Sequence, residues 1–126
     1  MATPADQLAN AAARGDLQLA SEMLEGGADP NAPNSLGRTP IQVMMMGCTK
    51  MAELLISYGA YPSIQDPDTG TSPAHDAARE GFVDTLIVLC KAGASITEPL
   101  DKYGKRPIDL VTEQMMEVLR QEQMLD

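Results

Sequence analysis

The chain is 126 residues long, with 44% hydrophobic residues, 3% aromatic residues and no tryptophan. This length predicts a single domain, residues 1–126, whose core is built from Ala, Leu, Ile, Val and Met. Acidic residues outnumber basic ones by 18 to 9, and the net charge of −9 argues against binding to nucleic acid or to an anionic membrane. The charge is compatible with a protein partner that presents basic residues.

The first predicted element is a pair of short helices. Thr3 can cap a helix that begins at Pro4 and ends at Gly15, because Pro suits the first helical position and Gly suits the left-handed conformation after the last one. Asp16 can cap the second helix. Residues 31–37, rich in Asn, Pro, Ser and Gly, then predict a connecting loop.

The second helix pair departs from the first. Its opening run, Pro40–Met46, contains the β-branched residues Ile41 and Val43, which are weaker helix formers than unbranched ones. We therefore expect a distorted helix of about one turn here. Thr49 is expected to cap the helix that follows, which ends at Gly59.

The third helix pair has the clearest signals. Ser72 is a good N-cap, Pro73 suits the first helical position, and Gly81 ends this helix. Connecting loops are predicted before and after the pair, at residues 62–70 and 98–104. The second helix of the pair carries its apolar residues at core spacing, namely Leu86, Ile87 and Leu89.

The last unit begins at Arg106–Pro107 and has no glycine after Gly104. We expect one continuous capping helix here, and the terminal unit is therefore atypical, as the ends of repeat proteins are. Val111, Met115, Val118, Leu119 and Leu125 could continue this helix.

Two sets of residues recur at a nearly constant interval. Pro40, Pro73 and Pro107 follow one another at 33 and 34 residues, and Gly-Ala pairs begin at residues 27, 59 and 93. A period near 33 with this opening and ending resembles the ankyrin repeat. The resemblance implies an all-α solenoid of about four helix-turn-helix repeats joined by hairpin-like loops, at approximately residues 4–36, 37–69, 70–103 and 104–126.

Longer segments resemble a narrower family, the ankyrin-repeat inhibitors of the cyclin-D-dependent kinases. Two of them, Pro40–Gly47 with its Met-Met-Met run and His75–Phe82, are not part of the general ankyrin pattern. The resemblance covers about residues 8–110. It implies a monomeric, non-enzymatic protein of the cytoplasm and nucleus, without a cofactor. Such a protein binds the kinase beside its ATP cleft, distorts the two lobes, blocks activation by cyclin D and arrests the cell cycle in G1.

By the same resemblance, the kinase-binding residues surround one aspartate. Asp76, in the first turn of its helix, is the expected central contact and pairs with an arginine of the kinase. Met is well suited to adaptable apolar contacts. The other expected contact residues are Arg79, Glu80, Phe82 and Asp84 beside Asp76, Met44 and Met45, and, as weaker candidates, Gln42, Arg14 and Asp66.

Several of these residues also have a plainer interpretation. His75, beside Asp76, is more simply explained as a residue that ties its own loop by hydrogen bonds than as a catalytic base. Arg79 and Glu80 could form a solvated pair, and the methionines could be core residues, Met46 in particular. An adaptor for another intracellular protein and an enzyme remain the alternative functions.

The sequence offers little chemistry for an enzyme or a metal site. Residues 66–70 faintly resemble a calcium loop, but Gly70 lies at loop position 5 rather than 6, and Ala77 stands where a Glu is needed. Cys48 and Cys90 are isolated, which favours reduced thiols over a disulfide or a zinc site. We therefore expect no metal, cofactor or nucleic acid.

Overall fold

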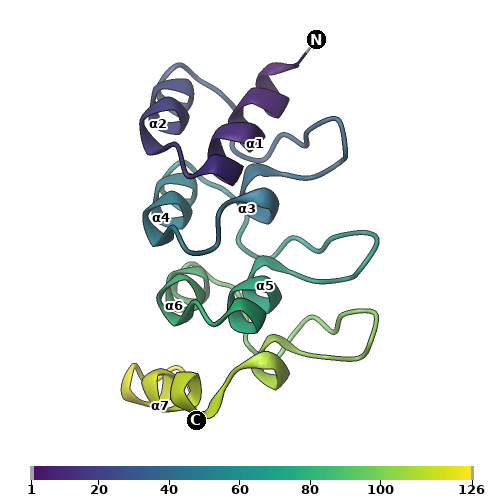
Figure 1. Ribbon diagram of the computed structural model, residues 1–126, viewed down its shortest axis with the longest axis vertical. Coiled ribbons are helices and arrows are strands. Elements are labelled where there is room, and N and C mark those ends of the chain that lie inside the picture. Colours follow the sequence, from purple (N-terminus) through teal and green to yellow (C-terminus); the bar gives the residue numbers. More distant parts are fainter. Residues whose placement is uncertain (1, 126) are drawn as a thin grey trace. The chain divides into compact units, whose positions relative to one another are not determined.

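The computed structural model describes residues 2–125, which form helices joined by loops (Figure 1). Contacts divide the chain into two compact units, Met1–Tyr61 and Pro62–Asp126. Each unit holds two successive pairs of helical elements. The predicted all-α, helix-turn-helix architecture is thus confirmed in each unit, while the prediction of a single domain stays a prediction.

The first unit consists of α1 (Pro4–Arg14), α2 (Leu17–Glu25), α3 (Pro40–Val43) and α4 (Thr49–Ser57). Helix α1 packs against α2 and α3, and α4 packs against α2 and α3, so that equivalent helices of the two pairs stack on one another. The core of this unit is aliphatic and rich in alanine: Leu8, Ala9, Ala11, Ala12, Ala20, Leu24, Ile41, Met44, Met46, Met51, Ala52, Leu55 and Ala60.

The ends of α1 follow directly from the sequence. The Thr3 hydroxyl accepts a hydrogen bond from the Asp6 N–H (3.1 Å), and the Asp6 carboxylate accepts one from the Thr3 N–H (3.0 Å). These reciprocal bonds satisfy backbone groups that have no partner inside the helix. Gly15 ends the helix with φ = 71°, a left-handed conformation that glycine adopts without strain.

Helix α3 is a single turn, as the sequence predicts. The chain leaves the helix at Met44, whose ψ of 155° is not helical. The next residue, Met45, donates its backbone N–H to the Ala12 carbonyl of α1 (3.0 Å), which anchors the exit of α3 to α1.

The prediction for the next helix is wrong by one residue, since Thr49 is the first residue of α4. Cys48 occupies the cap because its carbonyl accepts the first turn's bond, from the Met51 N–H (3.0 Å).

The second unit consists of α5 (Pro73–Glu80), α6 (Val83–Lys91), the 3-10 helix η1 (Pro107–Leu110) and α7 (Glu113–Gln121). Helix α5 packs against α6 and η1, and α6 packs against α7. The predicted caps of α5 are confirmed: the Ser72 hydroxyl accepts from the His75 N–H, and Gly81 ends the helix with φ = 84°. The buried residues are Ser72, Pro73, Ala74, His75, Ala77, Ala78, Thr85, Leu86, Ile87, Leu89, Ala94, Pro107, Met115 and Leu119.

The last repeat differs from the prediction of one continuous capping helix. It contains two elements, because the backbone is extended at Val111 (ψ = 151°) and Thr112 (ψ = 167°), which separates η1 from α7. Thr112 then starts a new helix, since its hydroxyl accepts a hydrogen bond from the Met115 N–H (3.1 Å). The repeat is short, but it keeps the pairing of two helical elements.

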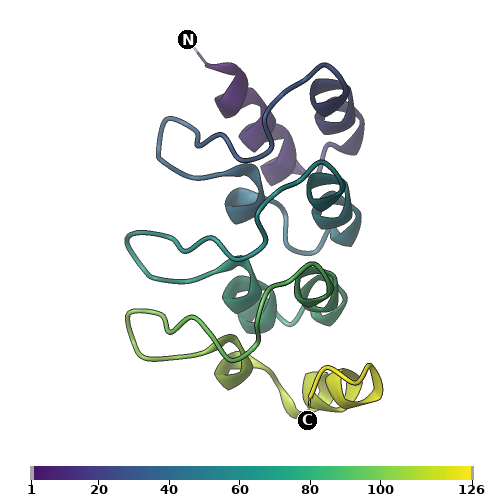
Figure 2. The same ribbon diagram turned by 180° about the vertical axis from the view of Figure 1, so that it is seen from behind.

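Three hairpin-like loops project from the helix pairs, the first from the first unit and the other two from the second (Figures 1 and 2). We call them the first finger (residues 31–39), the second finger (residues 62–72) and the third finger (residues 98–106). Each is closed by a backbone hydrogen bond across its base: Asn34 N–H to Arg38 O (2.8 Å), Asp66 N–H to Thr71 O (2.7 Å) and Asp101 N–H to Lys105 O (2.9 Å).

Neither cysteine forms a disulfide, since Cys48 and Cys90 are both free thiols. Burial raises the pKa of the Cys90 thiol to about 11, which keeps it protonated at neutral pH. Within residues 2–125, every helix is too short or too polar to cross a membrane.

Candidate functional site

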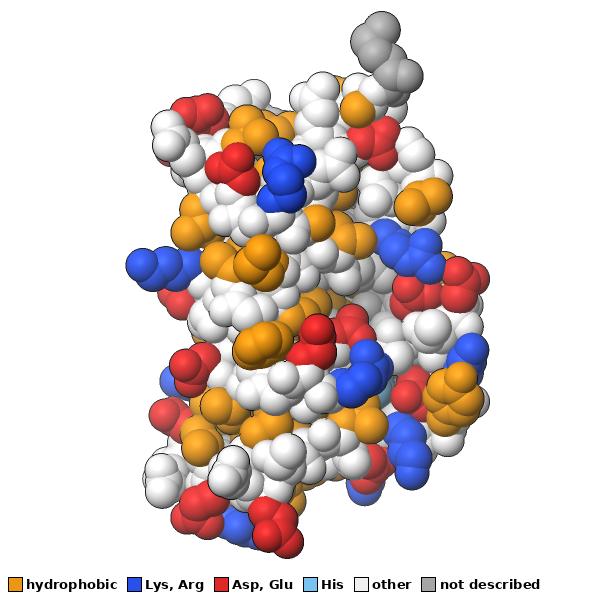
Figure 3. Space-filling model, in the orientation of Figure 1, with side chains coloured by type: hydrophobic (Ala, Val, Ile, Leu, Met, Phe, Trp, Pro, Cys, Tyr) orange, Lys and Arg blue, Asp and Glu red, His pale blue; other side chains and the backbone are white. Residues whose placement is uncertain are grey.

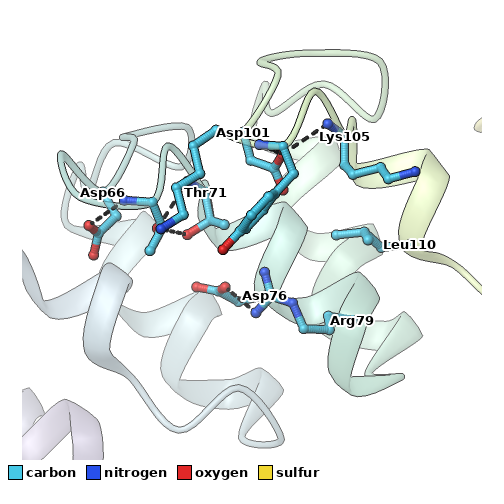
Figure 4. Close-up of a pocket in the computed structure, with 10 residues that line it drawn as sticks. Asp66, Thr71, Asp76, Arg79, Asp101, Lys105 and Leu110 are labelled. Atoms are coloured by element: carbon cyan, nitrogen blue, oxygen red, sulfur yellow. Dashed lines mark hydrogen bonds and ion pairs between the residues drawn. The ribbon is translucent and has the colours of Figure 1, made fainter.

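The second unit has a hollow of about 550 Å³ between its two fingers and the start of α5 (Figure 4). Both fingers and α5 contribute to it, so residues far apart in sequence share one small space. The lining residues are Asp66, Thr69, Thr71, Asp76, Arg79, Asp101, Lys102, Tyr103, Lys105 and Leu110. Three of them, Asp66, Asp76 and Arg79, were predicted as site residues from the sequence.

Asp76 is the central acidic group of this hollow. Its side chain is 26% exposed, and one carboxylate oxygen accepts a hydrogen bond from Arg79 Nη1 (3.0 Å). The other oxygen points away from Arg79 (Figure 4). Burial raises the pKa of Asp76, and this effect outweighs the opposing one of Arg79. A cation entering the hollow would therefore meet a carboxylate that one arginine only partly compensates.

The fingers that cover Asp76 are shaped by their own aspartates. One carboxylate oxygen of Asp101 accepts hydrogen bonds from the backbone N–H groups of Tyr103 and Lys105, both at 2.9 Å. These N–H groups, that of Lys105 first, lower the pKa of Asp101. Asp66 holds the turn of the second finger in the same way, by accepting from the Asp68 N–H (2.8 Å). Asp66 thus has a defined role in its finger, besides its predicted role as a contact.

His75 fastens the third finger to α5. Its ring is buried, with Nδ1 3.0 Å from the Ser72 nitrogen and Nε2 2.8 Å from the Lys105 carbonyl oxygen. The prediction that this residue ties its own loop is confirmed by the contact with Ser72. The contact with Lys105 extends that role to the neighbouring finger.

The remaining predicted residues of the second unit lie at the turn between α5 and α6. Glu80 is the last residue of α5, Phe82 is the N-cap of α6, and Asp84 lies in the first turn of α6. All three are exposed, Phe82 to 41%. They are outside the set that lines the hollow, so they form a separate exposed edge beside it.

The predicted residues of the first unit have different environments. Met45 is 47% exposed, whereas Met44 is 4% exposed and belongs to the core, as does Met46. Gln42 is half-buried, and its side-chain oxygen accepts from the Thr39 N–H (2.7 Å). Arg14 is exposed in the last turn of α1. Of the two predicted methionine contacts, Met45 is therefore the one that the surface presents.

Sequence reasoning missed the third finger's contribution to the hollow. Tyr103 is 74% exposed and, like Lys102 and Lys105, lines the same space as Asp76. A signal was available, because three of the nine Lys and Arg residues of the chain fall within residues 102–106. Figure 3 shows acidic and basic side chains close together on this face of the second unit. Among the described residues, no group of His, Cys, Asp and Glu could hold a metal ion.

Comparison with known proteins gives close matches. Residues 8–99 match the family model for ankyrin repeats (3 copies). The chain is 58% identical over 107 residues to "Cyclin-dependent kinase 4 inhibitor B" of Rattus norvegicus, which covers 85% of this chain and 82% of that protein. It is 57% identical over 113 residues to "Cyclin-dependent kinase inhibitor 2A" of Homo sapiens, which covers 90% of this chain and 72% of that protein.

Proposed function

Since this chain belongs to the ankyrin-repeat family of cyclin-dependent kinase inhibitors, we propose that it binds a cyclin-D-dependent kinase and holds it inactive. Relatives named as such inhibitors match most of the chain, which supports kinase inhibition as the activity. The proposed partner and the resulting G1 arrest rest on the family resemblance, and the proposed contact residues rest on that resemblance and on the geometry of the hollow.

The observation that carries the proposal is the state of Asp76. This carboxylate is largely desolvated, and its raised pKa means that the free protein holds the negative charge at a cost. Arg79 only partly compensates the negative charge of Asp76. An arginine of the kinase that entered the hollow would compensate this charge further by donating a charge-assisted hydrogen bond to the carboxylate. Asp76 is therefore the central contact of the proposed complex.

The exposed edge beside the hollow supplies further contact. Phe82 offers apolar area, and Glu80 and Asp84 add negative charge that attracts a basic kinase surface. In the first unit, Met45 offers a flexible apolar contact. We expect each of these residues to contact the kinase and to contribute less to binding than Asp76 does, as peripheral contacts usually do.

Inhibition is proposed to act by population shift. The inhibitor binds beside the ATP cleft and touches both lobes, so it favours the arrangement in which the lobes are displaced. A ligand shifts such an equilibrium only by its difference in affinity for the two states. The kinase is thereby held in a form that neither binds cyclin D productively nor aligns ATP, and the cell arrests in G1.

The test is binding of the purified protein to an isolated cyclin-D-dependent kinase, with Asp76→Asn beside the wild type. Because the fold disfavours the charged form of Asp76, the variant should be as well folded as the wild type by circular dichroism. We expect the variant to bind at least about 30-fold more weakly, since truncating one partner of a desolvated charge pair is costly.

Glu53→Gln is the matched control, because it removes one negative charge from an exposed position of α4. It should bind like the wild type. Folded wild-type protein that fails to bind would contradict the proposal and favour an adaptor for another partner. Equal binding by wild type and Asp76→Asn would keep the function and remove Asp76 from its centre.

A further inference from the structure

The third finger is a basic segment in an acidic protein. It carries Lys102, Lys105 and Arg106, although the whole chain has nine basic residues and a net charge of −9. Arg106 is engaged locally, with its guanidinium 2.8 and 3.1 Å from the two carboxylate oxygens of Asp109. Neither lysine amine forms an ion pair within the described part of the chain, and that of Lys102 lies 5.1 Å from the centre of the Tyr103 ring. Two positive charges are thus available to a partner.

The backbone that carries these lysines is held in place by hydrogen bonds. The Lys102 N–H donates to the Thr69 carbonyl of the second finger (2.9 Å), and the Lys105 carbonyl lies against the buried ring of His75. The Asp101 carboxylate accepts from the Lys105 N–H and closes the turn between them. A partner would bind this backbone without having to order it first, which lowers the entropic cost of association.

The same hollow therefore contains charges of both signs, and Asp76 is only partly compensated by Arg79. Asp76 belongs to α5, whereas Lys102 and Lys105 belong to the third finger. They form no ion pair with Asp76. A ligand that carries only positive charge would satisfy Asp76 and be repelled by the finger. A segment that carries both a basic and an acidic side chain satisfies both parts of the hollow.

We propose that the third finger is a second docking element for the kinase, in which Lys102 and Lys105 pair with an acidic residue next to the basic residue that Asp76 binds. This inference rests on the proposed function and specifies the partner surface as one of mixed charge. The exposed Tyr103 ring lies between the two lysines in sequence and offers apolar contact. Opposite charges a short distance apart fix the orientation in which the partner docks and disfavour uniformly basic competitors.

The test compares charge reversals on the finger with one elsewhere. Lys102→Glu and Lys105→Glu change the net charge by the same amount as Lys50→Glu, which lies at an exposed position of α4. Association rates with the isolated cyclin-D-dependent kinase are measured at about 0.05 M and 0.5 M salt, where screening lengths differ by roughly threefold. Circular dichroism and thermal melting confirm that each variant is folded, and Lys105→Ala provides a milder variant.

At low salt we expect each finger reversal to slow association about 5- to 10-fold, and Lys50→Glu to change it less than about twofold, because steering acts near the contact. Lys105→Ala should be intermediate, and all differences should shrink at high salt. If the wild type binds the kinase but Lys105→Glu and Lys50→Glu associate at equal rates, this inference is overturned and the proposed function stands. Absence of wild-type binding would overturn it together with the proposed function.

Discussion

The Nε2 atom of His75 lies 2.8 Å from the carbonyl oxygen of Lys105, a residue thirty positions further along the chain. The Ser72 backbone N–H donates to Nδ1 of the same ring (3.0 Å), so Nδ1 has to be the unprotonated nitrogen. The proton therefore sits on Nε2, which donates to Lys105. A neutral, buried imidazole thus joins the start of α5 to the third finger.

Replacing His75 by Phe should destabilise the protein strongly. The phenyl ring is larger than the fully buried imidazole, and the Ser72 N–H and the Lys105 carbonyl both lose a partner, so a loss of about 2–4 kcal/mol in the free energy of unfolding is expected. Urea unfolding measures it, and amide hydrogen exchange should accelerate most in the third finger. An unchanged midpoint of unfolding would contradict this role of His75.

Asp101→Asn and Asp101→Ala should differ sharply. The turn of the third finger needs one acceptor oxygen for the N–H groups of Tyr103 and Lys105, and an Asn side chain supplies it. Asn34 holds the first finger in this way, accepting from the N–H of Leu36 and of Arg38. We expect Asn to preserve kinase binding and Ala to weaken it, with faster proteolytic cleavage at the finger. Equal behaviour of the two variants would contradict this role.

Gly15→Ala and Gly81→Ala test two different costs of adding a Cβ atom. At Gly81 the new atom meets nothing within 4 Å, so strain at φ = 84° is the whole cost, about 1 kcal/mol or more. At Gly15, where φ is 71°, it would lie 3.1 Å from the Met45 sulfur. Gly15→Ala should therefore be the more destabilising in urea unfolding. In a Met45→Ala background the extra cost should disappear; if it persists, the contact is not its cause.

The contribution of Asp76 to the stability of the protein should fall as pH rises past the ordinary titration range of Asp. Burial raises the pKa of Asp76, so the folded state keeps its proton at pH values where the unfolded chain has released it. Stability then decreases with increasing pH across that window and stays lower above it. Asp76→Asn lacks this titration. We expect the variant to be at least as stable as the wild type at pH 7, and the difference in stability should vanish below about pH 4. A variant that is less stable than the wild type at pH 7 would contradict a destabilising contribution of the ionised Asp76.

Asp6 should affect the pH dependence of stability in the opposite direction to Asp76. Its carboxylate accepts from the Ser35 hydroxyl (2.7 Å) and the Ser35 N–H (2.7 Å), and these bonds keep its pKa below the usual range. The stabilisation is present above the pKa of the unfolded chain and is lost as pH falls toward the folded value. Ser35→Ala should therefore reduce the loss of melting temperature between pH 7 and about pH 3. Ser63→Ala, at an exposed position of the second finger, should leave that loss unchanged.

Much of the helical structure could be predicted because its signals are local. A Ser or Thr followed by Pro fixes where α1 and α5 begin, and Gly15 and Gly81 fix where they end. The prediction failed in the fourth repeat, where Thr112 starts a second element. The spacing of apolar residues from Val111 to Leu119 is compatible with one helix. A Thr inside such a run does not by itself identify the N-cap of a new helix.

The site was harder to predict because it depends on contacts between distant segments. Asp76 and Arg79 share one helix and form an ion pair at a spacing of three residues, whereas the sequence analysis considered a pair of Arg79 with Glu80. Tyr103 and Lys102 reach the same hollow through the third finger, whose position is set by His75 and Thr69. Nor does sequence distinguish the buried Met44 from the exposed Met45, since a helix of one turn has no periodicity to assign a face.

The brevity of α3 sets an order of events during folding. A helix of four residues does not persist in an isolated chain, because nucleation fixes several residues before hydrogen bonds repay it. Helix α3 gains its anchor when the Met45 N–H reaches the Ala12 carbonyl, which requires α1 to be in place. The first unit should therefore form from its N-terminal helix pair onward. Synthesis also proceeds from the N-terminus, so the ribosome releases these elements in the order in which they can assemble.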